Sequence, residues 1–119
     1  MSTFQPPVNP ILFAFIDNGN TSGVALTAGS TYTGAIRNVT YFNKVTMTVV
    51  SDQAGTLYIH QYMNKSSPAV ITTTVLYAGG GTPNVVNQSL SLPYYSIEYT
   101  NGGVDQVTFL VASKVSVFL

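Results

Sequence analysis

One histidine and four acidic side chains are the groups from which acid–base chemistry could be built in this chain. A Ser–His–Asp relay needs a carboxylate hydrogen-bonded to the imidazole. The acid nearest to His60 in the sequence is Asp52. If residues 52–55 close a hairpin, His60 lies opposite Met47 and about four residues from Asp52, roughly 13 Å along the strand. We therefore predict that His60 is an ordinary residue of a sheet surface and forms no relay.

Paired carboxylates are a second candidate. Glycoside hydrolysis uses two carboxyl groups about 5–10 Å apart, and Glu98 and Asp105 flank a predicted turn at 101–103. No arginine or histidine stands beside them, so we interpret them as carboxylates at strand ends. Residues 17–20 hold one carboxylate, fewer than a calcium loop concentrates. Residues 79–81 lack the Gly-Lys-Ser/Thr ending of a phosphate loop. We predict no catalytic residue, no metal site, no cofactor and no enzymatic activity.

Tyrosine is frequent, with eight residues, and it indicates contacts with partners. Tyr58 and Tyr62 share one face of a predicted strand over 56–63, and Tyr94 and Tyr41 would extend the same platform. A tyrosine ring packs well at protein interfaces, where its hydroxyl finds a hydrogen bond. We therefore take Tyr58 and Tyr62 as candidate partner contacts. Packing against protein is the favoured interpretation, and stacking on a carbohydrate is the alternative.

Charged residues are rare in this chain. They make up 7% of its 119 residues, against roughly 25% in an average protein, and the formal net charge is zero. A chain without a basic excess has no electrostatic footprint for nucleic acid. The absence of cysteine excludes disulfides and cysteine-based zinc sites. The apolar run Ile11–Ile16 is far shorter than the roughly 20 residues of a membrane span, so we expect no direct membrane insertion.

Strands must position these side chains. Val, Ile, Thr, Tyr and Phe, the residues typical of strands, make up 50 of the 119 positions, and Glu, Lys and Arg are too few for a helical bundle. Short alternating runs are separated by turn residues. The expected runs are Ile11–Ile16, a short one at Val24–Leu26, Thr31–Ile36, Lys44–Val50, Thr56–Met63, Val70–Tyr77, Val85–Leu92, Tyr94–Thr100 and Gln106–Leu119.

About eight strands without a helical period predict an all-β fold, an antiparallel β-sandwich. We favour an eight-stranded single jelly roll. An immunoglobulin-like sandwich stays open, although its frequent Cys–Trp–Cys core is absent here. Lys44–Val50 alternates cleanly, as a half-buried strand does. Ile11–Ile16 is apolar on both faces, so we expect both of its faces to be covered.

We divide the chain into an extended N-terminal arm, residues 1–10, and a single β-sandwich domain, residues 11–119. Three prolines remove backbone donors from the arm and favour extended conformations. An arm of this kind loses less entropy on docking than a glycine-rich one. The candidate partner contacts in the arm are Phe4, Pro6, Pro7 and Val8.

The low charge predicts self-association. Monomeric proteins usually keep their net charge away from zero, and edge strands are usually blunted with lysine or proline. Three lysines offer little such protection. Depletion of charge is also typical of the centre of an interface. We therefore expect much of the surface to be covered by copies of the same chain.

Two stretches of the sequence resemble a pattern that recurs in small β-domains of virus and phage structural proteins. In residues 39–59 an alternating strand runs into Ser51-Asp52-Gln53-Ala54-Gly55-Thr56-Leu57. In residues 94–103 an aromatic strand ends in Tyr-Thr-Asn-Gly, and Gln106 and the strand with Phe109 follow. The resemblance spans roughly residues 22–112.

The resemblance implies a structural virion protein located in the capsid. Such domains occur as single jelly-roll vertex (penton) proteins, as minor capsid proteins and as fibre or spike modules. We expect a vertex or minor capsid subunit that self-assembles, with a pentamer as one form, and docks on neighbouring capsid proteins. The alternative is a receptor- or carbohydrate-binding module, a fibre or spike head, with a glycan or receptor as its partner.

Overall fold

The structure is a computed structural model and describes residues 11–118. These residues form nine strands and one short 3-10 helix. The elements are β1 (Ile11–Ile16), η1 (Asn18–Asn20), β2 (Thr31–Thr33), β3 (Arg37–Asn38), β4 (Lys44–Ser51), β5 (Gly55–Tyr62), β6 (Ile71–Tyr77), β7 (Asn84–Ser89), β8 (Tyr94–Asn101) and β9 (Phe109–Phe118).

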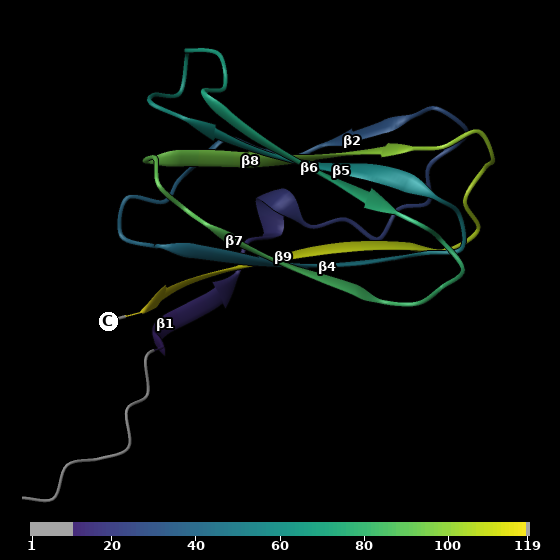
Figure 1. The fold of residues 1–119 in the computed structure, drawn as a ribbon, viewed down its shortest axis with the longest axis horizontal. Helices are drawn as coiled ribbons and strands as arrows, with labels where there is room; N and C mark the ends of the chain where they lie inside the picture. The colour runs from purple at the N-terminus through teal and green to yellow at the C-terminus, as the bar shows by residue number, and fades with distance from the viewer. Residues whose placement is uncertain (1–10, 119) are drawn as a thin grey trace, which may run out of the picture.

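Two antiparallel sheets form the sandwich (Figure 1). The order in one sheet is β1-β9-β4-β7, which we call the first sheet; the order in the other is β2-β8-β5-β6, with β3 also beside β8. The first strand pairs with the last, β2 and β3 with β8, β4 with β7, and β5 with β6. The chain is thus one long ribbon rolled so that β4 meets β9 and β5 meets β8. This is the topology of a jelly roll, as predicted.

The strand count is nine, where about eight were expected. The expected run Val24–Leu26 forms no strand, and the expected strand Thr31–Ile36 ends at Thr33 and is followed by the separate short strand Arg37–Asn38. The side chain of Asn20 enters the ladder beside β8. Its amide oxygen accepts the backbone N–H of Ile97 (2.8 Å), and its amide nitrogen donates to the carbonyl of Ala35 (2.9 Å). Gly34 makes room for it, since a Cβ there would collide with the Asn20 amide. β2 and β3 are therefore two pieces of one strand, both paired with β8.

The hairpin expected over residues 52–55 is wrong. β4 and β5 lie in different sheets, so the connection crosses the sandwich. Met47 lies opposite Val86 and Ser113, whereas His60 lies opposite Thr72 and Ser96. Alternation shows which face of a strand is buried, but it does not show whether consecutive strands pair or pack face to face.

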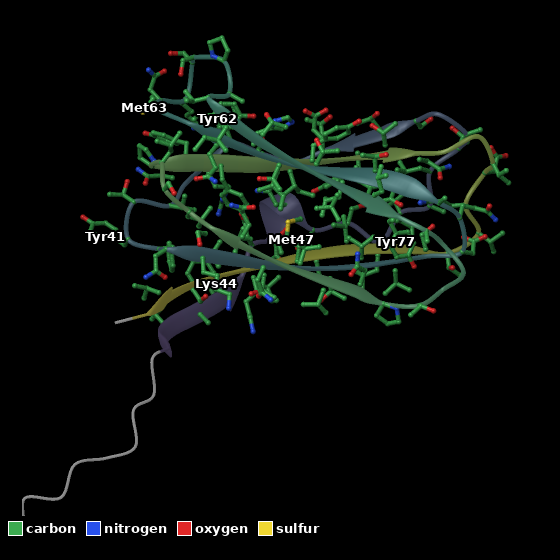
Figure 2. All side chains as sticks on the ribbon, viewed as in Figure 1. Tyr41, Lys44, Met47, Tyr62, Met63 and Tyr77 are labelled. Carbon is green, nitrogen blue, oxygen red and sulfur yellow. The ribbon has the colours of Figure 1, made fainter. Side chains whose placement is uncertain are left out.

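The core lies between the sheets and follows the alternation of the strands. Along β4 every second residue from Val45 to Ser51 is buried, and Figure 2 shows Met47 between the two layers. The opposite layer contributes alternate residues of β5 and a buried stretch of β8. The buried apolar side chains are Val39, Val45, Met47, Val49, Leu57, Ile59, Tyr77, Leu90, Tyr95, Ile97, Tyr99, Phe109, Val111 and Val115.

Tyr99 has an unusual place in this core. Its ring packs on Phe109, with centroids 4.9 Å apart. Its buried hydroxyl has no hydrogen-bond partner among the described residues. Gly55 lies against it, since a Cβ at this position would collide with the Tyr99 hydroxyl. Burial raises the pKa of Tyr99 to about 12.

We expect Tyr99→Phe to leave the free energy of unfolding at pH 7 within about 1 kcal/mol of the parent or to raise it, because an unpaired buried hydroxyl is removed. The two proteins should diverge at high pH. The unfolded tyrosine ionises from about pH 10, before the folded one, so its contribution to stability falls as the pH rises from 10 toward 12. Phenylalanine has no such loss. Denaturant unfolding at pH 7 and pH 11 measures both effects.

Tyr41→Phe is the matched control, because this tyrosine is 85% exposed and should change neither value. A loss of more than about 2 kcal/mol at pH 7 in Tyr99→Phe would show that the hydroxyl has a stabilising partner after all.

Candidate interaction surfaces

Three rings of β5 form a row on the outer face of the sheet β2-β8-β5-β6. We call Tyr58, His60 and Tyr62 the β5 ladder. The Tyr58 and His60 rings are nearly parallel with centroids 6.2 Å apart, and those of His60 and Tyr62 are also 6.2 Å apart but tilted. Figure 2 shows Tyr62 on the upper layer of the sandwich, close to Met63. The predicted sharing of one face by Tyr58 and Tyr62 is confirmed; their role as partner contacts stays a prediction.

His60 has a partner that the sequence did not indicate. Its Nε2 lies 2.6 Å from Oε1 of Glu98 on β8, and its Nδ1 lies 2.9 Å from the hydroxyl of Thr72 on β6. The nearest acid in sequence, Asp52, is not the partner. His60 and Glu98 both face outward on their strands, and this shared face is the signal for their bond. The signal can be recognised only when β5 is known to pair with β8.

A hydroxyl, an imidazole and a carboxylate in this order match the connectivity of a catalytic relay. Here, however, Thr72, His60 and Glu98 span three neighbouring strands of an outer sheet face. None of these three side chains lines any of the hollows described below. In this position the bonds tie β6, β5 and β8 together across their outer surface.

The remaining acids of the predicted chemistry also have structural partners. The Asp52 carboxylate accepts the backbone N–H groups of Val107 and Thr108, both at 3.0 Å. These bonds, that of Thr108 first, lower the pKa of Asp52. Asp105 accepts the N–H of Ala28 at 2.8 Å. Glu98 and Asp105, which we interpreted as carboxylates at strand ends, are thus engaged with different groups, and Glu98 lies within β8.

Asp17 is the buried acid of the structure, although the sequence predicted an ordinary turn. It caps η1 by accepting the N–H of Gly19 (3.0 Å). Its other oxygen accepts the Tyr95 hydroxyl (2.5 Å) and the Asn20 amide (2.9 Å). Arg37 reaches the same carboxylate at 3.3 Å. Burial, and next the Asp17 carboxylate, raise the pKa of Tyr95. We call these five residues the Asp17 network; it links the end of β1 to the opposite sheet.

β1 is the surface on which expectation and structure differ most. Both of its faces were expected to be covered, yet Phe13 is 57%, Phe15 42% and Ile16 50% exposed. The rings of Phe13 and Phe15 gather with Phe42 at centroid distances of 5.2–6.3 Å. Figure 1 shows β1 projecting from the sandwich beside the end of β9. The strand lies at the edge of its sheet, where no further strand of the described chain covers it.

Hollows in the described surface are shallow or small. A groove of about 230 Å³ is lined by Val39, Thr40, Phe42, Leu90, Ser91, Leu92 and Pro93. A second, of about 250 Å³, is lined by Leu76, Tyr77, Ala78, Gly79, Thr82, Pro83 and Asn84. A third, of about 30 Å³, lies between Phe15, Phe42 and the Asp17–Arg37 pair.

Residues 11–118 hold no group of three or more side chains suited to a metal ion. No helix in this part of the chain has the length and apolarity to cross a membrane. The predicted arm contacts, Phe4, Pro6, Pro7 and Val8, lie outside the described residues.

These observations define an all-β jelly-roll domain whose conspicuous surface features are an aromatic ladder and an uncovered edge strand. The family model described as "Uncharacterised protein YqxG N-terminal domain" matches residues 13–116. The chain therefore belongs to the family of YqxG N-terminal domains. No curated protein matches it.

Solved structures share the fold. The PBSX exported protein XepA is similar with a TM-score of 0.71 and 23% identity over 91% of this chain. This chain spans 38% of the length of XepA. A subunit of the Bacillus endospore appendages, described as disulfide-linked pili, has a TM-score of 0.50 at 8% identity and is covered completely, as is this chain.

A chain of infectious bursal disease virus, strain Gx, has a TM-score of 0.50 at 14% identity, over 99% of this chain and 36% of the viral one. The resemblance to β-domains of phage and viral proteins is thus confirmed at the level of the fold.

We expect Asp17→Ala to lower the free energy of unfolding by about 3 kcal/mol, because it leaves the buried Tyr95 hydroxyl without an acceptor and removes one of the two acceptors of the Asn20 amide. Asp105→Ala, at an exposed position with one backbone bond, should cost less than about 1 kcal/mol. Urea unfolding of both variants compares them. Equal losses of unfolding free energy in the two variants would show that the Asp17 network stabilises the fold no more than a single surface hydrogen bond does.

Proposed function

We propose that this chain is a structural, non-enzymatic subunit of a phage or virus particle. The role proposed is that of a capsid vertex (penton) or minor capsid subunit, which self-assembles and docks on neighbouring capsid proteins. The observation that carries the proposal is the uncovered apolar strand β1 in a chain with only 7% charged residues. Apolar surface of this kind favours association with another surface.

The outer faces of the sandwich support the same role. On the sheet with the β5 ladder, hydroxyl and amide groups bond to one another: Tyr62 to Ser96 at 2.7 Å and Thr31 to Thr100 at 2.9 Å. On the other sheet Thr46 donates to Asn87. Neutral groups that already have partners lose less hydration on burial than charges do. Such faces suit packing against further protein.

The fold relatives support a particle as the setting. One is the PBSX exported protein XepA, one comes from a virus, and one builds pili. The pili are described as disulfide-linked, and this chain has no cysteine, so its assembly would depend on noncovalent contacts. We accordingly propose the virion, within the capsid, as the location of the chain.

The proposed arm, residues 1–10, is the second element of assembly. Deleting it should leave a folded domain, because the described strands contain the whole jelly roll, and should weaken self-association by about tenfold or more, equivalent to about 1.4 kcal/mol. Light scattering over a range of protein and salt concentrations measures the association, and circular dichroism monitors the fold. A deletion variant that assembles as the parent does would contradict the role of Phe4, Pro6, Pro7 and Val8.

A receptor- or carbohydrate-binding module is the second candidate, and the β5 ladder is the observation that favours it. Aligned rings on an open sheet face can stack on sugar rings. If this is the function, Tyr58→Ala and Tyr62→Ala should each weaken glycan binding by about tenfold, since a contact aromatic often contributes more than about 1 kcal/mol. Tyr41→Ala, exposed but away from the ladder, is the control. A glycan array with no ligand for the parent chain would exclude the carbohydrate-binding form of this candidate.

A further inference from the structure

The exposed strand β1 is more specific than a general apolar patch. Phe13 and Phe15 lie on one face, opposite Val117 and Val115 of β9, and Ala14 and Ile16 lie on the other. All four residues are exposed. A strand that is apolar on both faces needs a neighbour that is apolar on both faces. Its free edge also presents backbone groups that can pair with another strand.

The other described edge strands do not match it. β7 has two adjacent valines, and its other residues, Asn84, Asn87, Gln88 and Ser89, are polar. β6 carries threonines at positions 72–74, and β2 is three residues long. Among the edge strands of residues 11–118, only β1 of a second copy offers an apolar side chain at every position of this stretch. Residues 13–16 contain no proline and no charged residue that would blunt the edge. The one irregularity in the register of β1 lies before them, between Ile11 and Phe13.

We infer that β1 pairs antiparallel with β1 of a second copy, about a two-fold axis that passes midway between the two Ala14 residues. The sheets β1-β9-β4-β7 of the two copies then become one continuous sheet. The inference rests on the proposed function as a self-assembling subunit. The inference adds to that function the strand that forms one of the subunit's contacts and the register of this contact.

The register follows from the two faces. Residues directly opposite in an antiparallel pair share a face, and a slip of one residue exchanges the faces. Centring on Ala14 sets Phe13 opposite Phe15 of the second copy, twice, and Ala14 opposite itself. Centring on Phe15 would set Phe13 opposite Asp17, which is committed to its own network. Centring on Phe13 would use Ile11 and Leu12, where the register of β1 is irregular. Within the regular stretch 13–16, Ala14 is therefore the centre that keeps apolar residues together.

The area predicts how strong this contact is. A phenylalanine carries roughly 200 Å², so the half-exposed Phe13 and Phe15 offer roughly 200 Å² per copy and 400 Å² in a pair, before Ile16 and the main chain are added. A stable independent complex buries about 1,200 Å² or more. The pair is thus a weak dimer in free solution, formed at about 100 µM and above, and in a particle it acts together with other contacts.

Ala14→Cys tests the register, because the chain has no cysteine of its own. Two cysteines opposite each other on antiparallel strands have Cα atoms about 4.5–5.5 Å apart, which a disulfide can span. At about 200 µM under mild oxidation, we expect a covalent dimer on a non-reducing gel, at a yield about tenfold above that of Leu76→Cys. Leu76 is the control because it is 78% exposed on the edge strand β6.

Ala14→Lys tests the contact without a crosslink. It places two positive charges beside the two-fold axis, so sedimentation equilibrium should show the dimer weakened by about tenfold. Leu76→Lys should sediment as the parent does, and the thermal unfolding of both variants should match the parent. Crosslinking of Ala14→Cys no better than that of Leu76→Cys, or an unchanged dimer in Ala14→Lys, would overturn the inference.

Two further outcomes separate this inference from the proposed function. If Ala14→Lys loses no assembly while the parent forms larger oligomers, the structural role stands and the pairing of β1 is wrong. If the parent is monomeric at every concentration and Ala14→Cys gives no crosslink, both fail. Crosslinking that begins only after residues 1–10 are deleted would assign the edge to that segment and overturn the pairing.

Discussion

An apolar strand that is paired along one edge only and only partly covered on its faces is unfavourable in water, and β1 is such a strand. Its backbone groups are bonded to β9 on one side, and Phe13, Phe15 and Ile16 remain about half exposed. Other proteins avoid such an edge with charges, proline or a covering loop. This chain has few charged residues, and none of them lies within β1. The account of an assembling subunit depends on this constraint, because a second protein surface resolves it.

The exposed strand is held in place by the Asp17 network. Asp17 follows β1 directly, its N–H donates to the carbonyl of Ser113 (2.8 Å), and its carboxylate accepts the Tyr95 hydroxyl of the opposite sheet. Asn20 continues the link through the N–H of Ile97. The end of β1 is therefore anchored across the sandwich. An anchored strand loses little further conformational entropy when it pairs, which favours association.

Much of the fold could be predicted from local patterns. The alternation of Lys44–Val50 correctly predicted a half-buried strand, and turn residues predicted strand positions close to those observed. Pairing between distant strands could not be obtained in this way, which is why the hairpin at 52–55 was wrong. The interruption of the expected strand Thr31–Ile36 depends on the amide of Asn20, a contact that no spacing in the sequence indicates.

The candidate site shows the same limit. Tyr58 and Tyr62 share a face because strand periodicity is a local property. The bond between His60 and Glu98 depends on the register of β5 and β8 and was missed. For β1 the sequence correctly marked both faces as apolar and predicted that both are covered. The described residues of this chain leave Phe13, Phe15 and Ile16 about half exposed.

The most direct test of the central claim is amide hydrogen exchange in Phe13–Ile16 as a function of protein concentration. About half of the amides in an edge strand point away from its neighbour and exchange quickly unless another strand pairs with them. The account predicts that protection of these amides increases with concentration while that of the edge strand β6 stays constant. Fast exchange in β1 that is independent of concentration up to about 1 mM, where even a weak pair would form, would contradict it.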